Sequence, residues 1–221
     1  MWFGLSLNQL IELFLGMRVA KRRYNPTATR EDILDAAERL FAAHGFGDVS
    51  TRRVAKEAGV SQSQIHYHFG TKRRLCGAVF ERGFGEYSAV QSSVLKKADV
   101  KGLDRMAESI RACFGFFRDN PPFVKLLGRI QLEGITDSGE PMAAELMQGG
   151  SKVIAQAQRA GELRADVEPQ FILIGFLSLV AYWFQCRGKY LPESGLPGAP
   201  EAYDEKYLDF ILKVYLRGIA R

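Results

Sequence analysis

The side chains best suited to chemistry lie in one short stretch, STRRVAKEAGVSQSQIHYHFG, which spans residues 50–70. Its second half predicts a helix that turns Ile65 and Phe69, four residues apart, into a core. The opposite face then carries amide, hydroxyl, imidazole and phenol groups. Such groups hydrogen-bond to base edges in the major groove or to phosphates, and glutamine pairs bidentately with adenine. The residues on this face are Gln62, Ser63, Gln64, His66, Tyr67 and His68.

The histidines of this stretch could alternatively be metal ligands. His66 and His68 are two residues apart, so on a helix they diverge by about 200° and cannot hold one ion together. His44 is separate, and no cysteine or carboxylate cluster completes a ligand set. The chain also lacks GxSxG, HExxH, a phosphate loop and a carboxylate pair. We therefore expect no metal, no cofactor and no enzymatic activity.

Two short helices joined by a tight turn must position the polar face. Ser50 can cap a helix over residues 51–58. Gly59 can adopt a positive φ in the turn without steric cost. Ser61 starts the next helix, and Gln64 three residues later completes a capping-box pattern. The sequence therefore predicts a helix-turn-helix, although a solvated surface helix following an ordinary turn would have the same local pattern.

The charge distribution favours the DNA-binding alternative. The net charge is +5, and residues 18–82 hold thirteen Lys and Arg against seven Asp and Glu, whereas residues 83–221 hold seventeen of each. A local positive field attracts polyanions. The helix after residue 70 begins with Lys72, Arg73 and Arg74. Cations in a first turn oppose the helix dipole but suit a nearby phosphate.

The preceding segment predicts the helix on which this pair packs. Thr29 can accept the backbone N–H of Asp32 as an N-cap, and Gly45 stands where a left-handed terminating residue is expected. Apolar residues recur between them at steps of three and four, giving one buried stripe. The stripe consists of Ile33, Ala36, Ala37, Leu40 and Phe41.

The run from Thr29 to Leu75 resembles the N-terminal DNA-binding region of the TetR family of transcriptional regulators. The shared motifs appear as ILDAAERLF, Gly45-Phe46, Ser50, VAKEAGVS and IHYHFGTKRRL. Two positions depart from the family pattern, since His66 and Arg73 stand where tyrosine and glutamate are frequent. The first departure leaves one contact at the groove edge open, and the second should strengthen non-specific attraction to DNA.

The resemblance assigns roles to individual residues. Ser50 and Thr51 would cap a helix and touch phosphate, and Lys72 would hold a phosphate at the start of the fourth helix. Residues of the second short helix would contact bases and backbone. The full set of expected DNA contacts is Ser50, Thr51, Arg52, Gln62, Ser63, Gln64, His66, Tyr67, His68 and Lys72.

Residues 74–221 predict about six further helices, so the fold class is all-α. These include residues 102–119, an almost wholly apolar segment at 169–190, and a final amphipathic helix within 201–220. The resemblance implies that the last two helices pair with their copies in a homodimer. The expected interface residues are Ile172, Phe176, Leu179, Val180, Trp183, Phe210 and Val214.

The larger half is rich in aromatic residues, which can either line an apolar ligand pocket or form plain core and dimer packing. A pocket among these helices is what the resemblance implies. The expected lining is Phe114, Phe117, Phe123, Leu127, Phe176 and Tyr182.

Composition sets the remaining expectations. Three scattered cysteines argue against a disulfide framework and fit a reducing cytoplasm, with a redox-sensing thiol as the alternative. The first seventeen residues are apolar but too short and too polar to span a membrane. They form either an extra amphipathic helix or an extension upstream of a true start at Met17. We expect an extension over residues 1–24, a DNA-binding domain over 25–73, and a ligand-binding and dimerisation domain over 74–221.

Together these features predict a cytoplasmic, ligand-responsive regulator, usually a repressor in the family. Its partners would be double-stranded DNA with a near-palindromic operator, a second copy of itself, and a small apolar or amphipathic ligand, without a membrane. The alternative is a DNA-binding adaptor whose C-terminal domain binds a protein and no small molecule.

Overall fold

The computed structural model describes residues 26–97, 99–100, 102–133 and 140–221. Within these ranges it contains nine α-helices and one short 3-10 helix, and its only β pairing is an isolated bridge between Leu163 and Ala220. The all-α prediction is therefore confirmed. The predicted extension over residues 1–24 lies outside the described residues.

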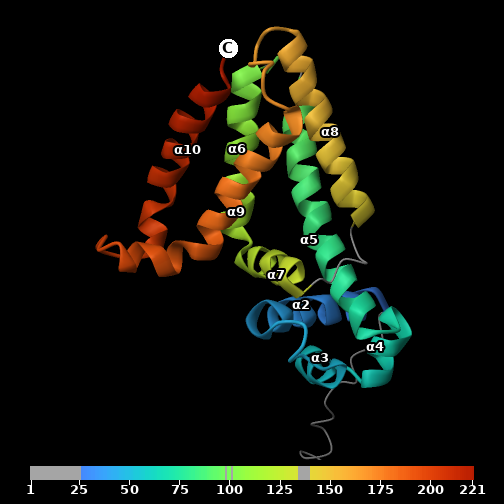
Figure 1. Ribbon diagram of the computed structural model, residues 1–221. Coiled ribbons are helices and arrows are strands. Elements are labelled where there is room, and N and C mark those ends of the chain that lie inside the picture. Colours follow the sequence, from blue (N-terminus) through green and yellow to red (C-terminus); the bar gives the residue numbers. More distant parts are fainter. Residues whose placement is uncertain (1–25, 98, 101, 134–139) are drawn as a thin grey trace, which may run out of the picture.

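The N-terminal region is a compact group of three helices below the rest of the molecule (Figure 1). These helices are α2 (Pro26–His44), α3 (Thr51–Ala58) and α4 (Gln62–Phe69). The predicted stripe of α2 is buried, and Gly45 ends the helix with a φ of +83°. Val54 and Ala55 of α3 and Ile65 and Phe69 of α4 pack into the same core.

The predicted start of the first helix is wrong. Helix α2 begins at Pro26, so Thr29 lies inside the helix with its side chain buried rather than at the N-cap. Proline is well tolerated at a first helical position, because its missing N–H would have had no partner within the helix.

A single long helix, α5 (Lys72–Leu95), connects the N-terminal helices to the larger half. It crosses the predicted domain boundary after residue 73 without a break. Arg82 on α5 forms ion pairs with three carboxylates of α2, at 2.6 Å to Asp35, 2.7 Å to Glu38 and 3.3 Å to Glu31. These contacts fix the direction of α5 relative to the helix beneath it.

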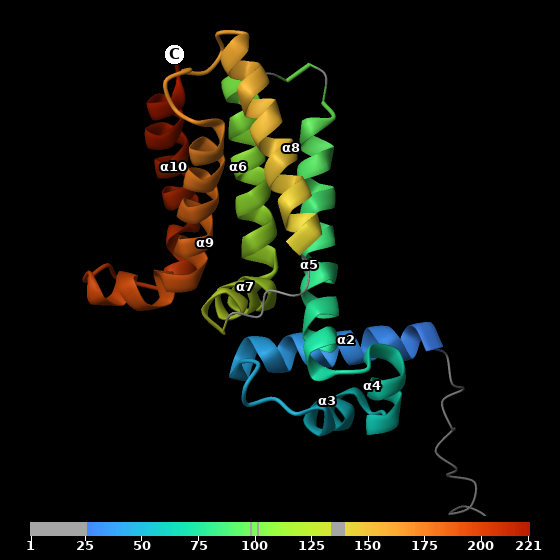
Figure 2. The same ribbon diagram turned by 45° about the vertical axis from the view of Figure 1, so that its right-hand side comes forward.

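The larger half contains α6 (Gly102–Asp119), α7 (Pro121–Glu133), α8 (Glu140–Arg159), α9 (Pro169–Glu193), the 3-10 helix η1 (Pro200–Tyr203) and α10 (Asp204–Ile219). Figures 1 and 2 show α5 and α8 side by side, α6 in the middle, and α9 with α10 on the other side. Helix α7 lies at the base of the group and packs on α2. The six predicted helices, including the bounds of α6, are thereby confirmed.

A second connection joins α7 to the loop after α2. The Phe46 backbone N–H donates to the Glu133 carboxylate, at 3.2 Å to Oε2, and Arg129 donates to the Ala43 carbonyl at 3.3 Å. The Phe123 ring of α7 contacts Phe80 of α5 and Phe116 and Phe117 of α6, so α7 packs on both the N-terminal helices and the core of the larger half. Movement of α7 would therefore displace the α2–α3 loop.

Helices α9 and α10 are held together by a buried polar cluster. Asp204 accepts a hydrogen bond from Trp183 Nε1 at 2.8 Å and pairs with Arg187, while Trp183 stacks on Tyr207 with ring centroids 4.0 Å apart. Within the described part, α9 is the one helix long and apolar enough to cross a bilayer by length and composition, with 28% of its most apolar window buried. Its contacts with α6, α8 and α10 account for part of that apolar surface.

Candidate nucleic-acid interface and ligand pocket

The helix-turn-helix is built by local capping, as the sequence predicts. Ser50 Oγ accepts from the Arg53 N–H at 3.2 Å, and Gly59 adopts a φ of +66° in the turn. The Ser61 N–H donates to Gln64 Oε1 at 2.8 Å, while Ser61 Oγ accepts from the Gln64 N–H at 3.3 Å. Both halves of the capping box are present, so the N-terminus of α4 is fixed.

This capping changes the interpretation of Gln64. Its side-chain oxygen already accepts from Ser61, and the residue is half-buried. Pairing with adenine needs the amide oxygen and nitrogen together. A base contact by Gln64 would therefore cost the helix its cap, so the base-reading role of Gln64 stays a prediction and its structural role is the better supported one.

The exposed face of α4 is formed by other residues of the predicted set. Gln62, Ser63, His66 and Tyr67 are exposed, and Tyr67 stands out with 78% of its surface accessible. Gln62 Nε2 donates to Thr51 Oγ1 at 3.1 Å, which connects α4 to the start of α3. An exposed tyrosine on a rigid, capped helix can insert into a groove with little loss of conformational entropy.

Two predicted residues have neighbours that constrain them. His66 Nδ1 lies 2.8 Å from the Gly70 carbonyl oxygen, which it can reach only as a donor, and this contact orients the ring at the end of α4. His68 is half-buried and edge-on to the Tyr67 ring, with centroids 5.1 Å apart. Among the described residues no group of three or more His, Cys, Asp or Glu side chains could hold a metal ion.

Lys72 has a different setting from the one the resemblance implies. Its ammonium donates to the Phe46 carbonyl at 2.7 Å and lies 4.2 Å from the centre of the Phe46 ring. A phosphate at the start of α5 would have to compete with that carbonyl. By contrast, Arg52 on α3 and Arg74 near the start of α5 are exposed.

The larger half contains a cavity of about 320 Å³ between α5, α6, α8 and α9. Of the six residues expected to line a pocket, only Phe176 does so. The buried rings of Phe117 and Phe123 contact each other, and the buried ring of Phe114 contacts Phe184. Leu127 packs against the core, and Tyr182 is 54% exposed on the outer surface. That part of the prediction is wrong, because the aromatic rings fill space with each other instead of enclosing it.

The residues that do line the cavity are mostly aliphatic, sulfur-containing or small. They come largely from α8, which contributes Leu146, Met147, Gly150, Val153, Ile154 and Ala157. Such residues carry no motif, and the only sequence signal was the amphipathic pattern of α8 itself. The polar lining residues are Tyr87, Gln91, Arg105, Ser109, Gln156 and Glu162.

The expected dimer surface is corrected in the same way. Ile172, Phe176 and Val180 are at most 2% exposed and face the protomer core, so they are not available to a partner. Leu179 and Trp183 are half-buried, and Phe210 and Val214 are exposed as predicted. Sequence reasoning missed Phe171 and Ile174, which are 66% and 46% exposed on the outer side of α9.

A capped helix-turn-helix under a separate helical half defines the chain as a DNA-binding regulator. The family model described as "Bacterial regulatory proteins, tetR family" matches residues 33–79, and "Tetracyclin repressor-like, C-terminal domain" matches residues 106–200. The chain therefore belongs to the TetR family of transcriptional regulators, and the resemblance found in the sequence is confirmed.

Individual relatives support this assignment. The chain is 22% identical to the HTH-type transcriptional repressor NicS of Pseudomonas putida, over 87% of this chain and 93% of NicS. It is 42% identical to the HTH-type transcriptional repressor AcnR of Corynebacterium glutamicum over 50 residues, which cover 23% of this chain and 27% of AcnR. These relatives are named as regulators, in agreement with the expectation that the chain is not an enzyme.

Solved structures share the fold. The TetR family regulator PfmR of Thermus thermophilus aligns with a TM-score of 0.66 and 18% identity, over 87% of this chain and 97% of PfmR. At that identity the likeness concerns the fold alone.

Proposed function

We propose that this protein is a ligand-responsive repressor that binds a near-palindromic operator as a homodimer in the cytoplasm. The observation that carries the proposal is the rigid helix pair α3–α4, whose exposed face presents Gln62, Ser63 and Tyr67 beside arginines. A helix of this kind fits the major groove, and its N-terminal residues are the ones that reach base edges. The naming of NicS and AcnR as repressors supports repression.

Dimerisation is supported by an exposed apolar surface on α9 and α10. Phe171, Tyr182, Phe210 and Val214 are each between 48% and 66% exposed on the side of the molecule formed by these two helices. A contiguous apolar patch on a soluble chain marks an interaction site. Twofold pairing of the two helices with their copies would give a four-helix interface and would place two α4 helices toward one face of DNA.

Within the helix-turn-helix we divide the contacts by chemistry. Gln62, Ser63 and Tyr67 are assigned to base edges and adjacent sugars, because they project from the exposed face of α4. Thr51, Arg52 and Lys72 are assigned to phosphates. Lys72 would exchange its Phe46 carbonyl for a phosphate oxygen on binding, so that the acceptor as well as the donor would be charged.

Ligand response is supported by the cavity and by the helix that leads from it. Helix α5 contributes Gln91 and Leu95 to the cavity wall at one end and carries Lys72 at the other. A ligand that fits one position of α5 better than another would change the separation of the two α4 helices. Linkage then requires DNA and ligand to weaken each other's binding by the same factor.

The test begins by selecting bound sequences from random duplex DNA with the purified full chain. We expect enrichment of a sequence with twofold symmetry and binding that weakens steeply with salt. Tyr67→Ala should reduce the preference for the selected sequence over random DNA by about 1–3 kcal/mol. Lys72→Ala should weaken both DNAs alike and lower the salt slope by about one, whereas Lys152→Ala on α8 provides the same charge change away from DNA and should have no effect.

Phe210→Glu tests the dimer. Placing a charge in the apolar surface should shift sedimentation toward the monomer and weaken operator binding, without changing the far-ultraviolet circular dichroism. Absence of salt-sensitive binding to any duplex would overturn the proposal. A Phe210→Glu protein that remains dimeric would overturn the assigned interface.

A further inference from the structure

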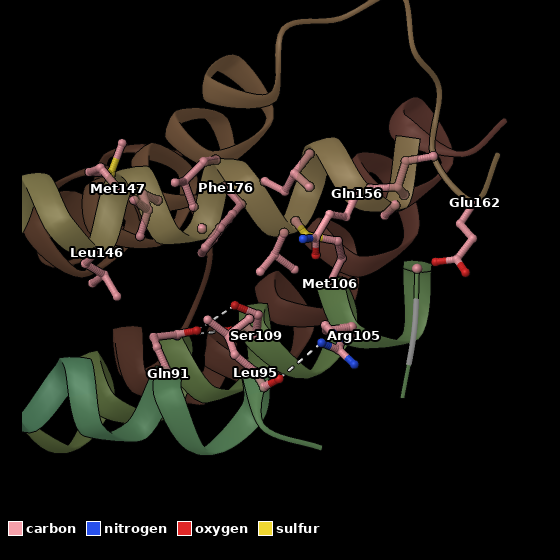
Figure 3. Close-up of a pocket in the computed structure, with 18 of the residues that line it drawn as sticks. Gln91, Leu95, Arg105, Met106, Ser109, Leu146, Met147, Gln156, Glu162 and Phe176 are labelled. Atoms are coloured by element: carbon pink, nitrogen blue, oxygen red, sulfur yellow. Dashed lines mark hydrogen bonds between the residues drawn. The ribbon is translucent and has the colours of Figure 1, made fainter. Parts of the chain in front are cut away.

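The chemistry of the cavity wall restricts what the cavity can bind. Figure 3 shows its long axis, with Leu146 and Met147 at one end and Arg105, Gln156 and Glu162 toward the other. Gln91 and Ser109 lie between these ends on the side formed by α5 and α6. Most of the remaining lining is aliphatic, so a bound molecule must be largely apolar to gain from burial.

The buried polar groups in the middle of the wall are neutral. Gln91 and Ser109 are 4% and 8% exposed. Ser109 Oγ donates to Gln91 Oε1 at 2.6 Å, and Gln91 Nε2 donates to the Ser109 backbone carbonyl at 3.1 Å. The Gln91 amide also hydrogen-bonds the Tyr87 hydroxyl. The remaining lone pairs of Gln91 Oε1 and Ser109 Oγ are therefore what the pair offers a ligand, and they suit one group that donates a hydrogen bond.

The two charged lining residues are already held by other parts of the protein. The Arg105 guanidinium donates from Nε to the Val100 carbonyl at 2.8 Å, from Nη1 to the Leu95 carbonyl at 3.1 Å, and from Nη2 to the Lys97 carbonyl at 2.8 Å. All of its nitrogens are therefore used to close the end of α5. The Glu162 carboxylate lies beside Gly102, the first residue of α6, where a helix end favours negative charge.

The approach of Glu162 to this helix end is close. A Cβ at Gly102 would lie 2.9 Å from Glu162 Cβ and 3.0 Å from Oε2, so the glycine is what permits it. A carboxylate headgroup would have to replace a backbone carbonyl at Arg105, and an amine would have to draw Glu162 away from the helix end. Elsewhere in the cavity either charge would be buried unpaired, which is strongly unfavourable.

We infer that the cavity binds an uncharged, mainly apolar molecule whose single hydroxyl, amide or similar group is held by Gln91 and Ser109. This inference rests on the proposed function only in taking the cavity as the effector site. It excludes carboxylates, phosphates and amines that are charged at neutral pH as the preferred ligands.

The test compares headgroups on a constant chain. Straight-chain alcohols from hexanol to dodecanol are titrated into the full-length protein by calorimetry at neutral pH, and the length that binds most tightly is selected. The carboxylate and the primary amine of that same length are then titrated. We expect the alcohol to bind at least about tenfold more tightly than either charged homologue.

Two matched variants locate the headgroup. Gln91→Leu removes the buried amide and should weaken alcohol binding by roughly fivefold to tenfold, the effect of one lost hydrogen bond. Gln148→Leu makes the same change at an exposed position of α8 outside the cavity lining and should leave binding unchanged. If Gln91→Leu does not fold, the double variant Gln91→Leu with Ser109→Ala removes both members of the pair and leaves neither side chain without its partner.

The outcomes separate the inference from the proposed function. Equal or tighter binding of the carboxylate or the amine would overturn the inference, and so would the absence of alcohol binding at every chain length. A Gln148→Leu effect as large as that of Gln91→Leu would also overturn it. An alcohol that binds through Gln91 yet leaves operator affinity unchanged would support the inference and contradict the proposed ligand response.

Discussion

Replacing Gly83 by alanine should destabilise the protein, although the same change at most helical glycines is stabilising. Alanine at an interior helical position gains about 0.5–1 kcal/mol over glycine. At Gly83, however, the added Cβ would lie 2.4 Å from Cδ2 and 2.9 Å from Cε2 of Phe123. Carbon atoms prefer separations of about 3.5–4.0 Å. The Phe123 ring is 2% exposed and is enclosed by Phe80, Phe116 and Phe117, so it has little space into which to move away from an added methyl group.

The size of the effect follows from these opposing contributions. Overpacking a core costs about 1–3 kcal/mol, and a contact this short belongs in the upper part of that range. Subtracting the helix gain leaves a net loss of about 1–2 kcal/mol. For a chain of this length that corresponds to a Tm lower by about 2–8 °C.

Gly85 supplies the matched control, because it lies two residues further along α5 and has nothing within 4 Å of its Cβ position. Gly85→Ala should therefore raise the Tm by about 1–3 °C. Both variants are melted by circular dichroism at one protein concentration, since the stability of a dimer depends on concentration. Equal stabilisation by the two substitutions would refute the tight packing of α5 on α7.

Three further predictions follow from the described contacts. Asp204→Ala should destabilise the chain by about 3–5 kcal/mol in urea unfolding, because it removes the buried partner of Arg187 and the acceptor of Trp183 and leaves Arg187 only the exposed Glu201 carboxylate. Glu205→Ala removes an exposed carboxylate that pairs with Arg118 and should cost at most about 1 kcal/mol. Equal losses would contradict the buried pair. Burial raises the pKa of Cys76 to about 11 and that of Cys113 to about 12. At pH 8 a thiol reagent should therefore modify at most one cysteine per native chain, and all three after unfolding. Labelling of either buried thiol in the native protein would show that the core opens. Gln64→Ala should lower stability by about 0.5–2 kcal/mol through loss of the cap. Gln62→Ala should alter the DNA sequence preference with little change in stability. The reverse pattern in parallel melts and DNA titrations would support the base-reading role of Gln64.

Features that depend on local chemistry could be predicted from the sequence. The Ser61–Gln64 capping box and the positive φ of Gly59 need only residues within four positions of one another. The start of α2 could not be predicted in this way, because Pro26 and Thr29 are both acceptable near a helix N-terminus and tertiary burial of Thr29 decided between them. Similarly, Lys72 matches a family position, but its Phe46 partner is 26 residues away in sequence.

The cavity and the dimer surface depend on how helices are placed relative to one another. Helix α9 is apolar on nearly every side, so periodicity could not distinguish Phe176, which faces the core, from Phe171, which faces outward. Aromatic residues can either line a pocket or form core packing, and the sequence alone did not decide between the two. In the structure, rings such as Phe114 and Phe184 pack against each other, with centroids 4.7 Å apart. The cavity forms where the small and flexible side chains of α8 meet α5 and α6.

Helix α5 gives a physical reason why a ligand in this cavity would act on DNA without unfolding the DNA-binding helices. Its 24 residues extend over about 36 Å at 1.5 Å per residue, from Lys72 to the cavity wall. The three ion pairs of Arg82 attach α2 to this helix, and Phe123 packed against Gly83 attaches α7. A displacement of α5 at Gln91 would move α2 through the Arg82 contacts, and α3 and α4 would follow because they pack into the same core as α2. Arg82→Ala should therefore weaken the effect of a bound ligand on operator affinity more than it weakens either binding reaction alone.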